Sequence, residues 1–274
     1  MKIKYLIIMF NAILVFLLLF AALAPFILIG PGFAVIFWRE AWPLALLIVL
    51  ALAGLNAFFI SNYPVYRLLE REDWPALAYY LEDKVYEKKQ YSLRNVRLLA
   101  NSYLELCDFP SAFKLESKVA IVKPSIVAKN VLIFGTARLL SGDYKRAAAF
   151  YKNCLARGKV PQKQWVLWFY ALSLMLEGDI ENAQKQFVAL AENSKDLVVT
   201  GLSAYFLASA LEKKSPRPEE CREVYEKCRM RVRAAYKNID NWKKETQKAK
   251  AEVHRAVIRK YINEAGTWLF EQKQ

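Results

Sequence analysis

The sequence predicts an all-α protein with a membrane anchor, an α-solenoid and a long C-terminal helix. Three observations support this prediction: two long apolar runs near the N-terminus, a motif that recurs about every 35 residues, and an apolar stripe near the C-terminus. We therefore expect an anchor over residues 1–62, a solenoid over 63–238 and an amphipathic helix over 239–274.

Two apolar segments predict two transmembrane helices. Residues 5–29 contain no charged side chain, and at 1.5 Å per residue they are long enough to cross a hydrocarbon core of ~30 Å. A second apolar run over 43–60 extends back to give an expected span at about 36–60. The two spans would form a transmembrane hairpin, with the lipid bilayer as one partner.

A cleaved signal peptide is the alternative explanation for the first segment. Lys2 and Lys4 would supply its basic start, and Ala22-Leu23-Ala24 resembles a cleavage site. Pro25 would follow the cut directly, where processing is disfavoured, and the apolar run is longer than a signal peptide needs. We therefore favour a retained helix.

Basic residues that flank the two spans predict the orientation. Lys2 and Lys4 precede the first span, and Arg67 and Arg71 follow the second, whereas the intervening loop has one basic residue beside one acidic residue. Cytoplasmic flanks carry an excess of Lys and Arg. We expect both termini and the solenoid to be cytoplasmic, with the spans in a bacterial inner membrane.

A repeated Asp followed by an apolar or aromatic residue marks the middle of the chain. It occurs at Asp73, Asp108, Asp143 and Asp179, with spacings of 35, 35 and 36. Small residues lie eight positions before it, at Ala100, Gly135 and Ala171, and alanines four positions after it, at Ala112, Ala147 and Ala183. Large residues follow four further on, at Leu81, Tyr151 and Phe187, with Glu116 as the exception. This pattern predicts one closely packed helix pair per repeat.

The segments GTARLLSGDYKRAAAFYKNCL and ALSLMLEGDIENAQKQFVAL resemble the tetratricopeptide repeat (TPR) family. The resemblance covers about residues 66–230 and implies a protein-binding α-solenoid. A further copy fits Ala208, Cys221 and Tyr225 if residues 214–218 carry an insertion.

In a TPR stack, the residues of the first helix that are not used for packing line the concave face. The resemblance thus predicts these partner-binding residues: Arg94, Arg97, Asn101, Lys129, Thr136, Trp165, Trp168, Leu172, Tyr205 and Ser209. Arg97 and Trp168 both stand eleven residues before their Asp, so both are expected in the groove. A basic end followed by an aromatic one suits a peptide that combines an acidic or carboxylate group with apolar anchors.

Arg97 and Asn101 resemble the first two members of the carboxylate clamp of some TPR domains. Ile133, Trp165 and Phe169 stand where the clamp needs Asn, Lys and Arg, so this specificity does not carry over. Two states of the groove remain open at this point: it is free for a peptide, or the C-terminal helix of the same chain fills it.

The segment from Asp240 to Phe270 is predicted to form one long helix with Asp240 as its N-cap. An apolar stripe runs through Trp242, Ala249, Val253, Val257, Tyr261, Ala265 and Trp268. We favour a cap on the last repeat as its partner. Another subunit, which would make a homo-oligomer, and the membrane surface are the alternatives.

Catalytic and metal-binding patterns are missing from the sequence. The four cysteines lie at mostly small or apolar positions, which predicts buried free thiols, and no C-x2-C spacing occurs. The single histidine, His254, lies in a basic helical stretch. We expect no catalytic residue, metal or cofactor. The net charge of +14 is interspersed with Glu and accompanies no nucleic-acid module, so no nucleic acid is expected as a partner.

We interpret the chain as a membrane-anchored TPR scaffold that recruits or organises proteins, and not as an enzyme. Its layout is similar to that of HemY-like inner-membrane proteins, which also place TPR repeats after two spans. Two alternatives remain: a periplasmic TPR component of an envelope or motor-associated assembly, and an accessory subunit of a membrane enzyme or secretion complex.

Overall fold

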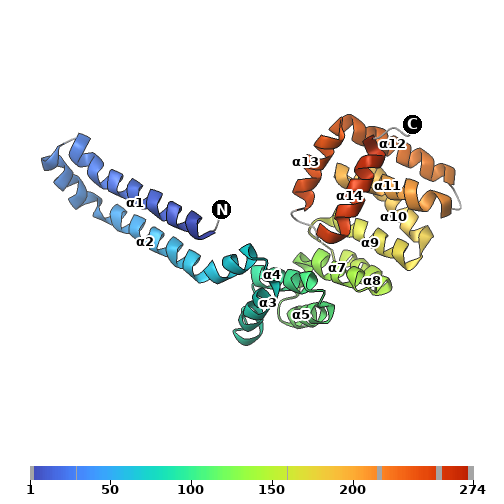
Figure 1. Cartoon of the computed structure of the whole chain (residues 1–274), viewed down its shortest axis with the longest axis horizontal. Coiled ribbons are helices and arrows are strands. Elements are labelled where there is room, and N and C mark those ends of the chain that lie inside the picture. The colour runs from blue at the N-terminus through green and yellow to red at the C-terminus, as the bar shows by residue number, and fades with distance from the viewer. Residues whose placement is uncertain (1–2, 29, 159, 215–217, 251–254, 271–274) are drawn as a thin grey trace. The chain divides into compact units, whose positions relative to one another are not determined.

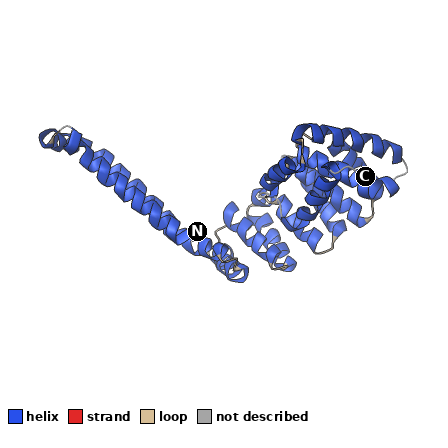
Figure 2. Cartoon of the chain, turned by 45° about the horizontal axis from the view of Figure 1, so that its top comes forward, coloured by secondary structure: helices blue, strands red, loops and turns tan. Residues whose placement is uncertain are grey.

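The computed structural model describes residues 3–28, 30–158, 160–214, 218–250 and 255–270 (Figure 1). All of these residues belong to helices or to their connections, and no described residue lies in a strand (Figure 2). The prediction of an all-α protein is therefore confirmed. The chain divides into two compact units, Met1–Tyr80 and Leu81–Gln274, and each is described by itself.

The first unit is built from α1 (Ile3–Leu28), α2 (Pro31–Glu70) and most of α3 (Trp74–Glu82). Helices α1 and α2 lie side by side: the rings of Phe10 and Phe59 are 6.0 Å apart, and the indole N–H of Trp38 donates to the carbonyl of Ala22 at 3.3 Å. The chain turns at Gly30, whose φ of 92° suits glycine, and Pro31 then occupies the first helical position.

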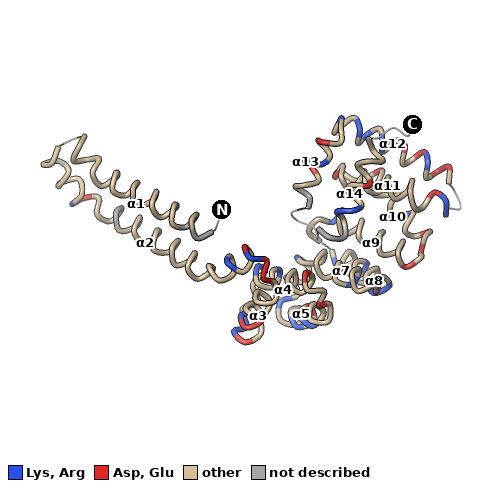
Figure 3. Tube along the Cα trace, viewed as in Figure 1, with Lys and Arg blue, Asp and Glu red and all other residues tan. Residues whose placement is uncertain are grey.

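Two stretches of this unit are long and apolar enough to cross a membrane, Ile8–Leu28 and Leu46–Glu70. Few of their residues are buried, and Figure 3 shows almost no charge along α1. The second stretch lies further along the chain than the expected span at 36–60. The difference at its start arises because Arg39 and Glu40 interrupt the first part of α2.

The second unit contains a succession of helices joined by short connections. These are α4 (Leu93–Glu105), α5 (Phe109–Val122), α6 (Pro124–Lys129), α7 (Val131–Leu140), α8 (Tyr144–Ala156), α9 (Lys163–Glu177), α10 (Ile180–Asn193), α11 (Leu197–Phe206), α12 (Pro218–Tyr236), α13 (Ile239–Lys250) and α14 (Arg255–Phe270). Short π-helical turns follow α3 at Asp83–Glu87 and α11 at Leu207–Leu211, and a 3-10 turn covers Glu212–Lys214. From α7 to α12, each helix packs against the next, and α7–α9, α9–α11 and α10–α12 are also in contact.

The four repeated aspartates share one structural role. Each directly precedes a helix, and its carboxylate accepts a hydrogen bond from the backbone N–H three residues on. The distances are 3.2, 3.2, 3.1 and 3.3 Å at Asp73, Asp108, Asp143 and Asp179. An N-cap of this kind stabilises a helix by about 1 kcal/mol. The period therefore marks the start of one helix per repeat.

The small residues of the repeat lie where helices pack closely. Ala112, Ala147 and Ala183 have no exposed surface. At Gly135 of α7, an added Cβ would fall within the ring of Tyr151 of α8, so only glycine fits there. Tyr151 and Phe187, eight residues after their Asp, are also fully buried. These contacts agree with the spacing that the sequence analysis identified.

Glu116 occupies the position that Tyr151 and Phe187 take in the later repeats, and the structure gives a reason. Its carboxylate lies 2.7 Å from the guanidinium of Arg138, and both side chains are less than one-fifth exposed. The same guanidinium lies over the rings of Phe113 and Phe150, at 5.1 and 4.2 Å. A mostly buried ion pair next to aromatic rings thus replaces the single aromatic side chain.

The C-terminal segment differs from the single long helix that the sequence predicted. The indole N–H of Trp242 in α13 donates to the carbonyl of Ile262 in α14 at 3.1 Å. Twenty residues of one continuous helix would place these groups about 30 Å apart, so α14 folds back on α13. The N-cap is Asn238, which accepts from the backbone N–H of Asn241, and not Asp240. The side chains of Ala249, Val253 and Val257 lie outside the described residues.

Two glycines explain why the segment folds back. A Cβ at Gly201 of α11 or at Gly266 of α14 would lie 2.9 Å from the ring of Trp242. The fully buried indole therefore fills a slot that both glycines keep open. The stripe that looked like one face of one helix is divided between two helices that pack on each other and on α11 and α12.

Candidate partner-binding surface

The residues predicted to line the groove fall into two groups. Four of them lie in the interior: Thr136, Trp168 and Leu172 have no exposed surface, and Trp165 is 7% exposed. Arg97, Lys129 and Ser209 are exposed, and Arg94, Asn101 and Tyr205 are half-buried. The structure therefore does not present the ten residues on one open surface.

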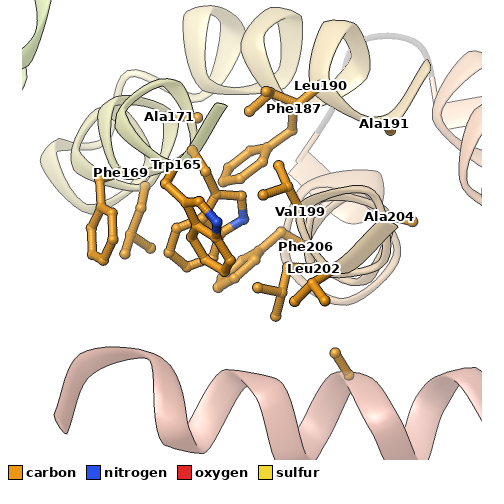
Figure 4. Packing of buried hydrophobic residues seen from close by; sticks show 14 of the residues in the cluster. Trp165, Phe169, Ala171, Phe187, Leu190, Ala191, Val199, Leu202, Ala204 and Phe206 are labelled. Carbon is orange, nitrogen blue, oxygen red and sulfur yellow. The ribbon is translucent and has the colours of Figure 1, made fainter. Parts of the chain in front are cut away.

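The aromatic part of the predicted groove is a packed core. The Trp168 ring lies 5.2 Å from Phe169, 5.7 Å from Phe206 and 6.4 Å from Phe187. Figure 4 shows Trp165, Phe187 and Phe206 in the same interior. Tyr261 of α14 completes this cluster, 6.4 Å from Trp168 and 4.9 Å from Phe206. Of the two states left open by the sequence, the structure has the filled one at this end.

Helix α14 is also held by polar contacts. The hydroxyl of Tyr205, a predicted groove residue, donates to the carboxylate of Glu264 at 3.0 Å. Burial, together with Glu264, raises the pKa of Tyr205. Trp268 packs near the rings of Tyr205 and Tyr225, and Arg229 lies over it at 5.0 Å. The ring and the hydroxyl of Tyr205 thus both hold α14 in place.

The basic part of the predicted groove remains accessible. Arg97 of α4 donates from Nε to the side-chain oxygen of Asn130 at 3.0 Å and from its terminal nitrogen to the carbonyl of Lys129 at 3.4 Å. Asn130 is itself buried and donates to the carbonyl of Ile126 at 2.9 Å. This chain of contacts fixes the orientation of an exposed guanidinium next to the junction of α6 and α7.

Arginines of α12 contribute to structure in another way. Arg231 donates to the carbonyls of Ala191 and Glu192 near the end of α10, at 2.9 and 3.1 Å. Arg233 donates to the carbonyl of Leu269 near the end of α14. Burial, and then Arg229, lower the pKa of Arg233. Cations near helix C-termini are stabilising, so part of the positive charge serves the fold.

The cysteines follow the prediction only in part. All four are free, and Cys221 and Cys228 are buried, but Cys154 is half-buried and Cys107 is exposed. The expectation that Cys107 is buried is wrong, because it lies in the connection before Asp108 and not within a helix. Burial raises the pKa of Cys154 and Cys228. Within the described parts of the chain, no three His, Cys, Asp or Glu side chains gather as potential metal ligands.

Comparisons with known proteins identify the family. A family model described as "Uncharacterised Treponema protein" matches residues 111–271. An uncharacterized protein of Treponema pallidum (strain Nichols) is 30% identical over 280 residues, which cover 98% of this chain and 88% of the relative. The chain belongs to this family. Neither description names a tetratricopeptide repeat, and no solved structure matches the chain.

The family match includes α14 and most of the aromatic core beneath it. Arg94, Arg97 and Asn101 of α4 lie before the matched residues, although the alignment with the T. pallidum protein extends over nearly the whole chain. Three residues of the predicted basic part thus lie outside the family match, whereas Lys129 and the filled aromatic part lie within it.

Proposed function

We propose that the protein is a membrane-anchored scaffold. In this proposal, α1 and α2 form a transmembrane hairpin in a bacterial inner membrane, and the helices that follow form a TPR-like solenoid in the cytoplasm. The repeated N-caps and the close contact of Gly135 with Tyr151 support the solenoid. The two membrane-length apolar stretches support the anchor.

The observation that carries the binding function is the exposed, oriented guanidinium of Arg97. Its contacts with Asn130 and with the carbonyl of Lys129 restrict its rotamers before any partner arrives. Less conformational entropy is then lost on binding. Guanidinium groups form strong, charge-assisted hydrogen bonds with carboxylates. Lys129 is also exposed nearby, so the surface suits an acidic segment of a partner protein.

A charge reversal tests this proposal. Arg97→Glu should weaken capture of acidic partners by about thirtyfold, the effect expected of an interface hot spot worth ~2 kcal/mol. Lys152→Glu on α8, also at an exposed position, is the matched control for net charge. Partners would be captured by crosslinking in native membranes and identified by mass spectrometry, with circular dichroism as the folding control. If both variants stay folded and keep the same partners, Arg97 is not a binding residue.

The native exposed thiol of Cys107 tests the proposed orientation. A membrane-impermeant maleimide added to intact spheroplasts should leave Cys107 unmodified and should label it after lysis. Cys107→Ser supplies the background signal from the other cysteines. Labelling before lysis would place the domain in the periplasm and would favour an envelope or motor-associated assembly over a cytoplasmic scaffold.

A further inference from the structure

The end of α5 carries two exposed aliphatic residues. Ile121 is 85% exposed and Val122 is 52% exposed. Single exposed apolar residues are common on soluble proteins and need no explanation. These two are adjacent and stand among lysines, so we define an α5 corner that consists of Lys114, Lys118, Ile121, Val122 and Lys123.

The three lysines of the α5 corner surround the aliphatic pair. Lys114, Lys118 and Ile121 are spaced by four and three residues, which places them on one face of α5, and all are exposed. The ammonium group of Lys118 lies 4.4 Å over the ring of Tyr86. Lys123 follows the helix and donates to the carbonyl of Tyr91 at 3.1 Å. Lys118 thus lies one helical turn before the aliphatic pair and Lys123 directly follows it, at the same end of α5.

The π-helical turn that holds Tyr86 also carries Glu87 and Asp83, and Asp83 pairs with Lys88. Along the chain after α5, little negative charge is present. Between Glu116 and Glu177 the chain has ten basic residues and a single acidic one, Asp143. Glu116 is directed to Arg138, 2.7 Å away, and both are mostly buried. The stretch between Glu116 and Glu177 therefore contributes most of the net positive charge of the protein. Most of the α5 corner lies at the exposed start of this stretch.

The composition of the α5 corner favours a lipid surface over a protein. Protein hot spots are rich in Trp, Tyr and Arg. The α5 corner instead presents aliphatic residues and lysines, the combination by which peripheral segments enter the headgroup region and contact lipid phosphates. The inference rests on the proposed membrane anchor, which two helices of membrane-spanning length support.

We propose that the α5 corner docks on an anionic lipid bilayer, with Ile121 and Val122 in the headgroup region and the lysines on lipid phosphates. Each lysine near such a surface contributes about fivefold to the docking equilibrium at moderate salt. This inference requires a membrane but no protein partner. Its test is therefore separate from the capture experiment with Arg97→Glu.

The experiment uses the full chain alone in proteoliposomes. An environment-sensitive dye is attached to Ile121→Cys in a Cys107→Ser background, and quenching by spin-labelled lipids is measured. In vesicles of phosphatidylcholine with phosphatidylglycerol, the dye should be quenched and its emission should shift to the blue, and high salt should reverse both changes. In pure phosphatidylcholine, both changes should be weak. A dye on Glu181→Cys, at an exposed position of α10, is the control for non-specific proximity.

Charge variants complete the test. Lys118→Glu combined with Lys123→Glu should weaken docking by at least thirtyfold, since two lysines are lost, and should abolish the salt-sensitive quenching. Lys213→Glu with Lys214→Glu, both exposed on the 3-10 turn, is the matched control and should retain it. Circular dichroism confirms that the variants are folded. Equal quenching at both dye positions, or no quenching with phosphatidylglycerol, would overturn the proposal. If the α5 corner is shielded from thiol labelling in native membranes but not in lipid vesicles, its partner would be an acidic protein instead of lipid.

Discussion

Arg97 in α4 and Trp168 in α9 stand at the same place in the repeat, eleven residues before the Asp that caps the next helix. Arg97 is exposed, whereas Trp168 has no exposed surface. The repeat pattern alone therefore does not determine whether this position faces solvent. What decides it is the presence or absence of a further layer over the helices.

That further layer is α14, which contacts α11 and α12. Ile258, Ile262, Ala265 and Leu269 of α14 are fully buried. Burial of apolar surface stabilises the folded state by about 25 cal/mol per Å², so the packing of this face of α14 contributes substantially to stability. The later region, α9–α14, uses its aromatic residues for its own stability, while the earlier region, α4–α8, retains exposed polar groups.

The two regions should differ most in how much stability is lost when a side chain at the equivalent repeat position is replaced by alanine. Trp168→Ala should destabilise the protein by about 3–5 kcal/mol, because it leaves a cavity among five aromatic rings. Arg97→Ala should cost less, about 1–2 kcal/mol, because it removes the donor to the buried side-chain oxygen of Asn130. Urea unfolding of the full chain in detergent, followed by tryptophan fluorescence and circular dichroism, measures both. Similar costs for the two variants would contradict the division into a filled and an open region.

A second prediction concerns the pair of Glu116 and Arg138 in the earlier region. Glu116→Ala should cost about 2–3 kcal/mol, because it leaves a mostly buried guanidinium without its carboxylate. In the next repeat, the same two positions hold Tyr151 and Leu174. Phe187 fills the same position as Glu116 in a repeat that also has alanine eight residues before its Asp. The double variant Glu116→Phe with Arg138→Leu should therefore recover most of the lost stability. If the single variant is as stable as the native chain, the ion pair is not structural.

Several features of the fold could be predicted because they are local or periodic. The Asp period located the start of each second helix, since an N-cap depends on a carboxylate and the three residues after it. Buried alanines at Ala147 and Ala183 followed from the same spacing. At these small residues, neighbouring helices pack closely against one another in the structure.

Other features depended on contacts between distant residues and could not be predicted. Helical spacing around Trp242 is the same in one long helix and in two helices that fold back. Only its fit against Gly201 and Gly266 distinguishes them, and those glycines are far apart in the sequence. Likewise, the spacing placed Trp168 on a helix face, but burial under Tyr261 required knowledge of the path of α14.

A third prediction tests the close helix contact in the earlier region. Ala147→Leu places extra methyl groups at a fully buried site in α8 and should cost about 1–3 kcal/mol. Ala149→Leu, two residues on and exposed, should leave the urea midpoint nearly unchanged. Equal midpoints for the two variants would remove the support that this site gives to the repeat register.

The N-caps provide a comparison in which the two regions should behave alike. Asp108→Ala in the earlier region and Asp179→Ala in the later one should each cost about 1 kcal/mol, since each removes one acceptor from the first turn of a helix. The matching Asn variants should retain most of that stability, because Asn is an equally good cap. At Asp179 the carboxylate also accepts from the side-chain amide of Asn182 at 2.8 Å, an exposed contact that adds little. A loss well above 2 kcal/mol at Asp108 would show that its carboxylate makes a further contact.

The smallest expected effect appears only at high pH. Burial, and then Glu245 and Asp196, raise the pKa of Tyr236 to about 12, compared with about 10 in an unfolded chain. The unfolded state therefore loses this proton first, and stability falls as the pH rises from about 10 to about 12. Phenylalanine has no proton to lose, so Tyr236→Phe should not show this decrease in stability. We expect the difference in the free energy of unfolding to be less than about 1 kcal/mol, because water screens the half-buried ring. At pH 7 the variant should match the native chain in urea unfolding. In the earlier region, Tyr103→Phe should already be destabilising at pH 7, because the hydroxyl of Tyr103 donates to Glu82 at 2.7 Å. A Tyr236 variant that unfolds with the native pH profile would show that its hydroxyl is fully hydrated in the folded protein.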